Sequence, residues 1–152
     1  MCSSDLFLRL VYVKSRPEGG GLPGLLEVTK SLGHLMMSPR DEQALAIVND
    51  GRWKKPPQVI GWKFLPFFEG ALAVRRDAKS GLTALLMAPS RDCFAVSTYY
   101  GEEPHRSIYM SMFGRDIKTG QTDQAQSRLI VGLRISDEQA IQRYQAYLRS
   151  VK

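Results

Sequence analysis

The stretch GEEPHR, residues 101–106, places acidic, basic and imidazole side chains together directly after two tyrosines. His105 is one of only two histidines, whose unperturbed pKa lies near neutrality. Aromatic rings pack against the apolar C–H faces of sugars, and charged groups hydrogen-bond the hydroxyls. We therefore expect a carbohydrate to be bound by Tyr99, Tyr100, Glu102, His105 and Arg106, with Trp62 as a second aromatic platform. A solvated hairpin loop, and a core position for Trp62, are the alternatives.

The lone acid in WKFLPFFEGALAV is Glu69, and burial there would raise its pKa towards the range that suits proton transfer. Glu102, Glu103 and Asp116 are further carboxylates, and a carboxylate pair at the right separation hydrolyses glycosides. Glu69 and His105 are therefore the candidate catalytic residues. A turn whose backbone N–H groups bond the Glu69 carboxylate is an equally good interpretation. The pattern leaves open whether the chain is an enzyme.

Neither a cofactor nor a metal is expected. Residues 19–24 match the dinucleotide pattern G-x-G-x-x-G, which works only where a strand leads directly into a helix. Here a four-residue spacer follows the preceding strand, and Pro23 breaks the expected helix start. No Cys/His spacing resembles a zinc site. Cys93 and His34 are interpreted as a buried small apolar residue and a half-buried structural histidine.

The composition is that of an ordinary globular domain, with 152 residues, 43% hydrophobic and 24% charged. The net charge is +6, but the basic residues are scattered, and the tightest groups, 52–55 and 75–76, form no long stripe. A solvated surface is therefore favoured over nucleic-acid binding. No apolar run approaches the ~18 residues of a membrane-spanning helix, so no membrane contact is expected. The oligomeric state is left open.

Short apolar runs separated by Gly, Asp and Ser turns predict an all-β, mainly antiparallel domain. The expected strands are 7–14, 71–76, 82–88, 93–100, 107–113 and 127–135. Residues 25–38 are interpreted as two strands broken at Gly33, with a short helix as the alternative. The run 44–48 is followed by Asn-Asp-Gly, which favours a tight hairpin turn.

Alternation along the last strands predicts which residues are buried, because neighbouring side chains in a strand point to opposite faces. Ile108, Met110 and Met112 share one face of their strand. In the last strand, the alternation predicts a core face of Leu129, Val131, Leu133 and Ile135. Both faces of 93–100 are apolar, so we expect this strand to be covered on both sides or to meet a ligand.

A single helix is expected at the end of the chain. Ser136 and Gln139 form a capping-box pattern, in which the Ser hydroxyl accepts from the Gln N–H and the Gln side chain bonds back. Apolar residues then recur at helical spacing. The pattern predicts an amphipathic helix over 137–149, packed on the sheet.

The first six residues, MCSSDL, fit neither a signal peptide nor a transit peptide. Codons for this string resemble the end of a common sequencing adapter, so residues 1–6 are interpreted as an artefactual leader; a genuine Ser/Asp-rich terminus is the alternative. Residues 7–152 would then be a single incomplete β-sandwich domain from the C-terminal part of a longer protein. Its first strand would have lost its partner and would lie at an exposed edge. Localisation is left open, and a secreted or periplasmic parent is compatible with this interpretation.

The segment SIYMSMFGRDIKTGQTDQAQSRLIVGLRISDEQAIQRYQAYL, residues 107–148, is similar to the closing segment of bacterial galactose-mutarotase-like proteins with a β-supersandwich fold. The preceding ALLMAPSRDCFAVSTYY also fits such a chain. This resemblance implies carbohydrate binding on the concave face of a large sheet. Catalytic mutarotases use two histidines and a glutamate, but neither His34 nor His105 aligns with that pair, so catalysis is not carried over.

The sequence therefore predicts the C-terminal part of a carbohydrate-binding or carbohydrate-processing β-supersandwich protein. The alternative is a non-enzymatic structural sandwich module of a larger protein.

Overall fold

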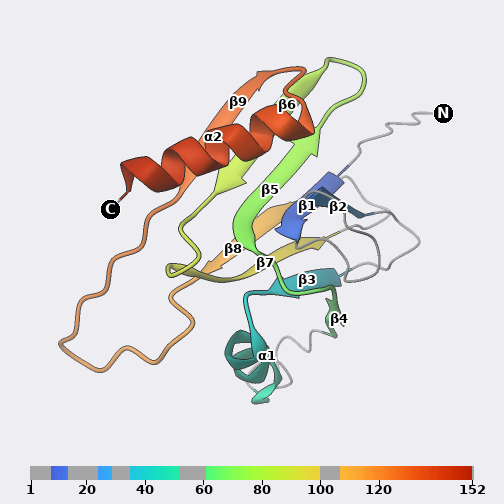
Figure 1. Cartoon of the computed structure of the whole chain (residues 1–152). Coiled ribbons are helices and arrows are strands. Elements are labelled where there is room, and N and C mark those ends of the chain that lie inside the picture. The colour runs from blue at the N-terminus through green and yellow to red at the C-terminus, as the bar shows by residue number, and fades with distance from the viewer. Residues whose placement is uncertain (1–7, 14–23, 29–34, 52–60, 100–106, 152) are drawn as a thin grey trace.

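The computed structural model describes residues 8–13, 24–28, 35–51, 61–99 and 107–151. These residues form a mostly β structure with two sheets, one short helix and one C-terminal helix (Figure 1). Neither described helix is long and apolar enough to cross a membrane.

The larger sheet has five strands, each antiparallel to its neighbours, in the order β2-β1-β5-β6-β9. Its strands are β1 (Leu8–Val13), β2 (Gly24–Val28), β5 (Gly70–Arg76), β6 (Leu82–Met87) and β9 (Arg128–Leu133). The expected strands in these segments are confirmed. The first strand does not lie at an edge, because β1 pairs with β2 on one side and with β5 on the other. The expectation of a lost partner was therefore wrong.

The smaller sheet has four strands in the order β4-β3-β7-β8. Its strands are β3 (Leu35–Pro39), β4 (Lys63–Phe64), β7 (Cys93–Tyr99) and β8 (Ile108–Met112). The pairs β3–β7 and β7–β8 are antiparallel, whereas β3 and β4 run parallel. Since β2 and β3 are separate strands, the two-strand interpretation of residues 25–38 is confirmed.

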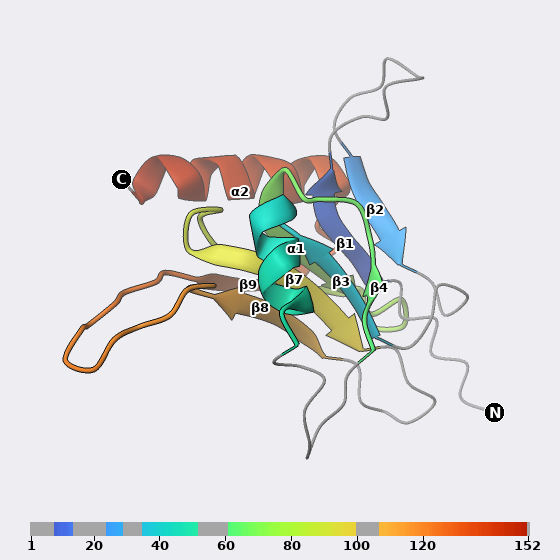
Figure 2. The same cartoon turned by 90° about the horizontal axis from the view of Figure 1, so that it is seen from below.

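The two sheets face each other across one apolar cluster, and a helix covers each outer face (Figures 1 and 2). The central cluster joins side chains from both sheets, among them Met36 and Val96 from one and Ala71 and Ala73 from the other. Helix α2 (Asp137–Ser150) covers the five-stranded sheet, and α1 (Glu42–Asn49) covers the four-stranded sheet. The order of layers is therefore helix, sheet, sheet, helix.

Strand β7 is buried on both of its faces, as its apolar composition predicts. Cys93 and Val96 belong to the cluster between the sheets. Phe94 and Ala95 pack instead against α1, and a register shift between Cys93 and Ala95 accompanies the change of side. Strand β8 adds Ile108, Met110 and Met112 to the central cluster, and this predicted face is also confirmed.

The C-terminal helix begins as predicted. The Ser136 hydroxyl accepts from the Gln139 N–H at 3.2 Å, and the Gln139 side chain accepts from the Ser136 N–H at 3.0 Å. Ala140, Tyr144 and Tyr147 are buried against Leu72 and Leu85 of the sheet.

The short helix α1 was not predicted, since residues 44–48 were expected to lead into a hairpin. The Asp41 carboxylate caps this helix by accepting from the Ala44 N–H at 2.8 Å. Gly51 follows the helix with a φ of 96°, a conformation that glycine adopts readily where a helix ends. The Asp-Gly pair therefore ends a helix here rather than turning a hairpin.

The predicted core face of β9 is also wrong. Leu129, Val131 and Leu133 are 63%, 61% and 70% exposed, and only Ile135, which lies beyond the strand, is buried. Ile130 packs instead towards α2. Alternation identifies which residues share a face, but the face that becomes covered depends on where α2 docks.

Candidate functional site

Two of the expected sugar-binding aromatic residues lie in one row across the four-stranded sheet. Tyr99 is opposite Leu35, and Met36 pairs with Lys63, so Trp62 comes level with Leu35 on the far side of β3. Two strand spacings, roughly 10 Å, therefore separate the two positions.

Both aromatic residues lie on the outer face of this sheet. Residues directly opposite one another in a ladder share a face, so Tyr99 lies on the face of Leu35 and Met37. Met37 packs with Val48 of α1, and Trp62 packs against the same cluster. Trp62 and Tyr99 are both half-buried. Trp62 therefore serves the packing of α1 and keeps part of its surface in solvent.

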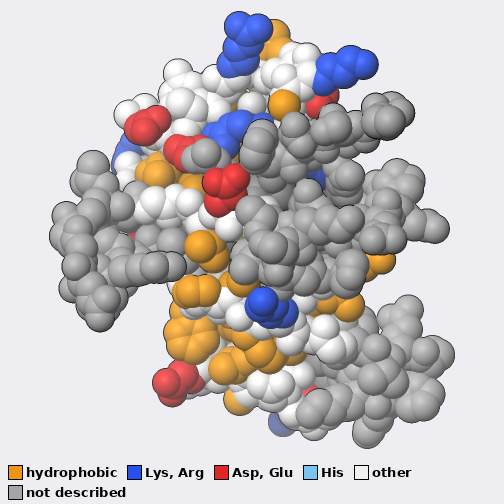
Figure 3. Space-filling view, turned by 90° about the vertical axis from the view of Figure 1, so that its right-hand side faces the viewer, with side chains coloured by type: hydrophobic (Ala, Val, Ile, Leu, Met, Phe, Trp, Pro, Cys, Tyr) orange, Lys and Arg blue, Asp and Glu red, His pale blue; other side chains and the backbone are white. Residues whose placement is uncertain are grey.

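Apolar side chains continue beside this row. Phe64 and Phe67 are among the exposed large apolar residues. Figure 3 shows apolar side chains gathered in the lower half of one side of the molecule, at the height of β4 and α1. The outer face of the four-stranded sheet therefore borders an apolar surface.

The remaining expected ligand-binding residues, Tyr100, Glu102, His105 and Arg106, lie outside the described residues, as does His34. Glu69 is described, and its side chain is exposed, directly before β5. Exposure removes the burial on which its proposed role in proton transfer depended.

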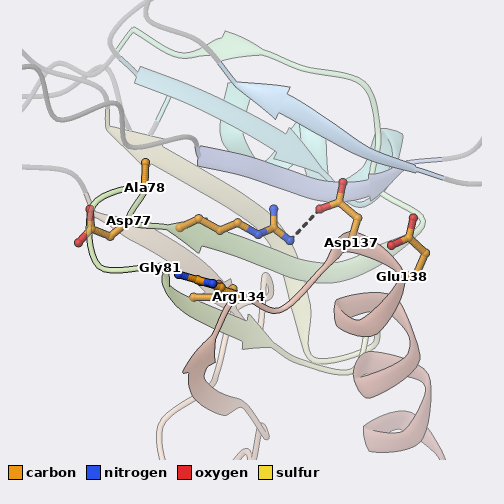
Figure 4. Close-up of a pocket in the computed structure, with 8 residues that line it drawn as sticks. Asp77, Ala78, Gly81, Arg134, Asp137 and Glu138 are labelled. Atoms are coloured by element: carbon orange, nitrogen blue, oxygen red, sulfur yellow. Dashed lines mark ion pairs between the residues drawn. The ribbon is translucent and has the colours of Figure 1, made fainter.

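Sequence reasoning missed a cleft between the β5–β6 turn and the start of α2. Its volume is about 440 Å³. Figure 4 shows Asp77, Ala78 and Gly81 of the turn on one side and Asp137 and Glu138 at the start of α2 on the other. The lining residues are Arg76, Asp77, Ala78, Gly81, Thr83, Arg134, Asp137 and Glu138.

Two arginines of this cleft, Arg76 and Arg134, are fixed in place by contacts at the ends of their strands. The Arg76 guanidinium lies 2.7 Å from Asp137 Oδ1, and Arg76 Nε donates to the carbonyl of Ile135 at 3.0 Å. Arg134 has a φ of 49° and donates its backbone N–H to the Gly81 carbonyl at 2.8 Å. Its side chain lies against Gly81, where an added Cβ would come within 3.2 Å of Arg134 Cγ.

Two carboxylates of the cleft, those of Asp77 and Glu138, have lowered pKa values. Hydrogen bonds from the Ser80 hydroxyl and the Lys79 N–H lower the pKa of Asp77. The pKa of Glu138 is lowered by its own backbone N–H and by the Ser136 hydroxyl. Groups with lowered pKa values are poor proton donors at neutral pH. The arrangement suits hydrogen bonding to a polar ligand better than acid/base catalysis.

One further polar group lines this cleft. Thr83 is buried, and its hydroxyl has no hydrogen-bond partner among the described residues. The only sequence signal for the cleft was local, namely the Arg75-Arg76 pair and the acidic first turn of α2. Neither signal predicts that the two segments meet.

The described part of the chain contains neither a cluster of metal-binding side chains nor an activated cysteine. No cluster of three His, Cys, Asp or Glu side chains could hold a metal there. Cys93 is buried, and burial raises the pKa of its thiol to about 12, so little reactive thiolate forms at neutral pH. Its predicted role as a small buried residue is confirmed.

No protein-family model, curated protein or solved structure matches the chain.

Proposed function

We propose that this chain is the C-terminal part of a carbohydrate-binding β-supersandwich protein of the galactose-mutarotase-like kind. The observation that carries the proposal is the row formed by Tyr99 and Trp62 on the outer face of the four-stranded sheet. Residues 100–106, which carry the other expected ligand-binding side chains, follow Tyr99 directly in the sequence.

Binding is proposed rather than catalysis. Aromatic rings supply apolar contact area at a low entropy cost, which suits the C–H faces of sugars. The candidate acid Glu69 is exposed. A binding role requires no group with a raised pKa, whereas proton transfer to a glycosidic oxygen does.

Sugar titration by calorimetry and tryptophan fluorescence tests the proposal, using galactose, glucose and oligosaccharides that contain them. Tyr99→Ala and Trp62→Leu should each weaken binding at least tenfold; leucine retains apolar packing against α1. Ile117→Ala, at an exposed apolar residue between β8 and β9, is the matched control and should bind like the wild type. Circular dichroism establishes that each variant is folded. Absence of sugar binding by the wild type, or unchanged affinity in both aromatic variants, contradicts the proposal.

A structural module within a larger protein is the second candidate. The uncovered apolar face of β9 favours it, because large exposed apolar patches mark interaction surfaces. A module of this kind would bind no sugar and would associate through β9.

A further inference from the structure

An apolar stripe lies uncovered along the last strand of the five-stranded sheet. It consists of Leu82 on β6 and Leu129, Val131 and Leu133 on β9, with exposed fractions of 47%, 63%, 61% and 70%. Leu82 pairs directly with Leu133, so these side chains share one face of the sheet. Such a concentration of exposed apolar side chains is unusual on a monomer surface.

The backbone of β9 is also open. Strand β9 is last in the order of its sheet, and β6 is its one partner among the described strands. An edge strand presents unpaired N–H and C=O groups, and proteins usually protect such edges with charged residues, Pro or a bulge. The central residues of β9, Leu129 to Val131, are all apolar and offer none of these.

We propose that β9 pairs with β9 of a second copy of this chain, antiparallel and with a two-fold axis at Val131. In that register Val131 faces its own copy, and Leu129 faces Leu133 of the second copy. Positions directly opposite in an antiparallel ladder share a face, so the two stripes join into one. The match is a property of the strand itself, because its three exposed apolar residues are spaced symmetrically about Val131.

The symmetry of the strand is the reason for choosing a second copy as the partner. A two-fold interface requires a surface that complements itself, and this one does so in both its backbone and its side chains. In this register Arg128 comes level with Arg134 of the second copy, and this like-charge pairing weakens the dimer. Arg128 lies over the Tyr147 ring, 4.6 Å from the ring centre, and Arg134 packs on Gly81.

Helix α2 lies on the face of β9 that carries Ile130, opposite to the stripe. Its C-terminal end reaches past β9 in both cartoon views (Figures 1 and 2). Leu148 near that end is also exposed. A six-residue strand is only about 20 Å long, so the interface falls below the ~800 Å² per partner of a standard complex. We therefore expect a dimer of micromolar affinity that strengthens with salt, which screens repulsion between copies of net charge +6.

Sedimentation equilibrium of the full chain, from about 1 to 500 μM, measures the association. The wild type should dimerise in this range. Val131→Lys should weaken the dimer at least tenfold, because two ammonium groups would meet at the two-fold axis. Phe67→Lys, which places the same charge at an exposed apolar residue before β5, is the matched control and should dimerise like the wild type.

The register is tested by paired charges. In L129K/L133E each lysine would face a glutamate of the second copy, whereas in L129K/L133K lysines would face one another. The first variant should dimerise at least tenfold more tightly than the second. Since both positions are exposed, both variants should keep the wild-type circular dichroism spectrum.

Three results would overturn the proposal: a wild type that stays monomeric to 500 μM, a dimer that survives Val131→Lys, or equal association of the two double variants. If the wild type is a monomer, the stripe does not bind a second copy of this chain. Equal association would mean that the copies do not pair in this register. The proposal is independent of sugar binding, because loss of dimerisation leaves the sugar titrations unaffected.

Discussion

The ring of Tyr144 on α2 lies directly against the backbone of Gly70, the first residue of β5. A Cβ added at Gly70 would overlap the ring edge at Cε1 and come within 3.1 Å of Cζ. The Tyr144 hydroxyl donates to the Ala88 carbonyl at 3.1 Å, which fixes the ring in this position. The absent side chain of Gly70 thus sets how closely α2 approaches the five-stranded sheet.

We expect Gly70→Ala to destabilise the fold by about 1–3 kcal/mol, the usual cost of overpacking a core. The reason is the clash with Tyr144, so the cost should shrink in a Tyr144→Leu background, whose shorter side chain leaves room for the methyl group. Urea unfolding of the wild type, the two single variants and the double variant measures this coupling. If the losses in free energy of unfolding of the two single variants simply add in the double variant, the clash with Tyr144 is not what destabilises Gly70→Ala.

The short helix α1 depends on its cap. Asp41→Ala should cost about 1 kcal/mol of stability, because the Ala44 N–H loses its acceptor. Asp41→Asn keeps an acceptor and is the matched control, with a smaller expected loss. Urea unfolding with far-ultraviolet circular dichroism measures both. Equal stability of the two variants would contradict a capping role.

The cap should also weaken in acid. Burial alone would raise the pKa of Asp41, but hydrogen bonds from Arg40 and the Ala44 N–H lower it. A carboxyl whose pKa is lower in the folded state stabilises the fold above its unfolded pKa of 3.8, and this contribution is lost as the pH falls through the folded value. Asp41→Asn should therefore lose less stability than the wild type between pH 4 and 2. An equal loss of stability in the wild type and in Asp41→Asn over this pH range would contradict the prediction.

Alkali should destabilise the fold through Cys93. Its thiol has a pKa of about 12 when folded, raised from 9.0 by burial, so above pH 9 the unfolded chain releases a proton that the folded chain retains. Stability should fall by about 1.4 kcal/mol per pH unit from this residue. Burial also raises the pKa of Tyr144 and Tyr147, so Cys93→Ala should flatten the slope without abolishing it. Unfolding by urea between pH 8 and 11 measures the slopes, and equal slopes in the two proteins would contradict the prediction.

The ion pair in the cleft should matter more than those on open surfaces. Arg76 is largely buried, and Asp137→Asn would remove the negative charge of its ion-pair partner. We expect a loss of about 1–3 kcal/mol, the range for a buried charged group that loses its partner. Asp123→Asn is the matched control, because Asp123 pairs with Arg115, whose side chain is half exposed. Urea unfolding of both variants checks the difference, and equal losses would contradict it.

Local signals predicted much of the fold. Six strands follow from short apolar runs between turn residues, and α2 follows from its capping box, since both signals act within a few residues. The pair Asp50-Gly51 was wrongly interpreted as a hairpin turn, because a glycine with a positive φ occurs both in hairpin turns and at the ends of helices. The capping residue Asp41, nine residues before Asp50, was the signal that would have distinguished a helix from a hairpin.

For the candidate sites, the sequence supplied residue types but not their neighbours. Tyr99 and Trp62 were both named, yet only the pairing of β3 with β4 and β7 brings them into one row. The cleft was missed because Arg76 meets Asp137, which lies 61 residues later in the chain.

By itself, the sequence determined a chain rich in strands that ends in a capped helix, because side-chain alternation and capping are local properties of the backbone. The tertiary structure alone decided which face of β9 is covered. Docking of α2 on Leu72 and Leu85 buries Ile130 and leaves Leu129, Val131 and Leu133 in solvent. Period two makes the two faces of a strand distinct, but only packing between distant elements determines which of them is removed from water.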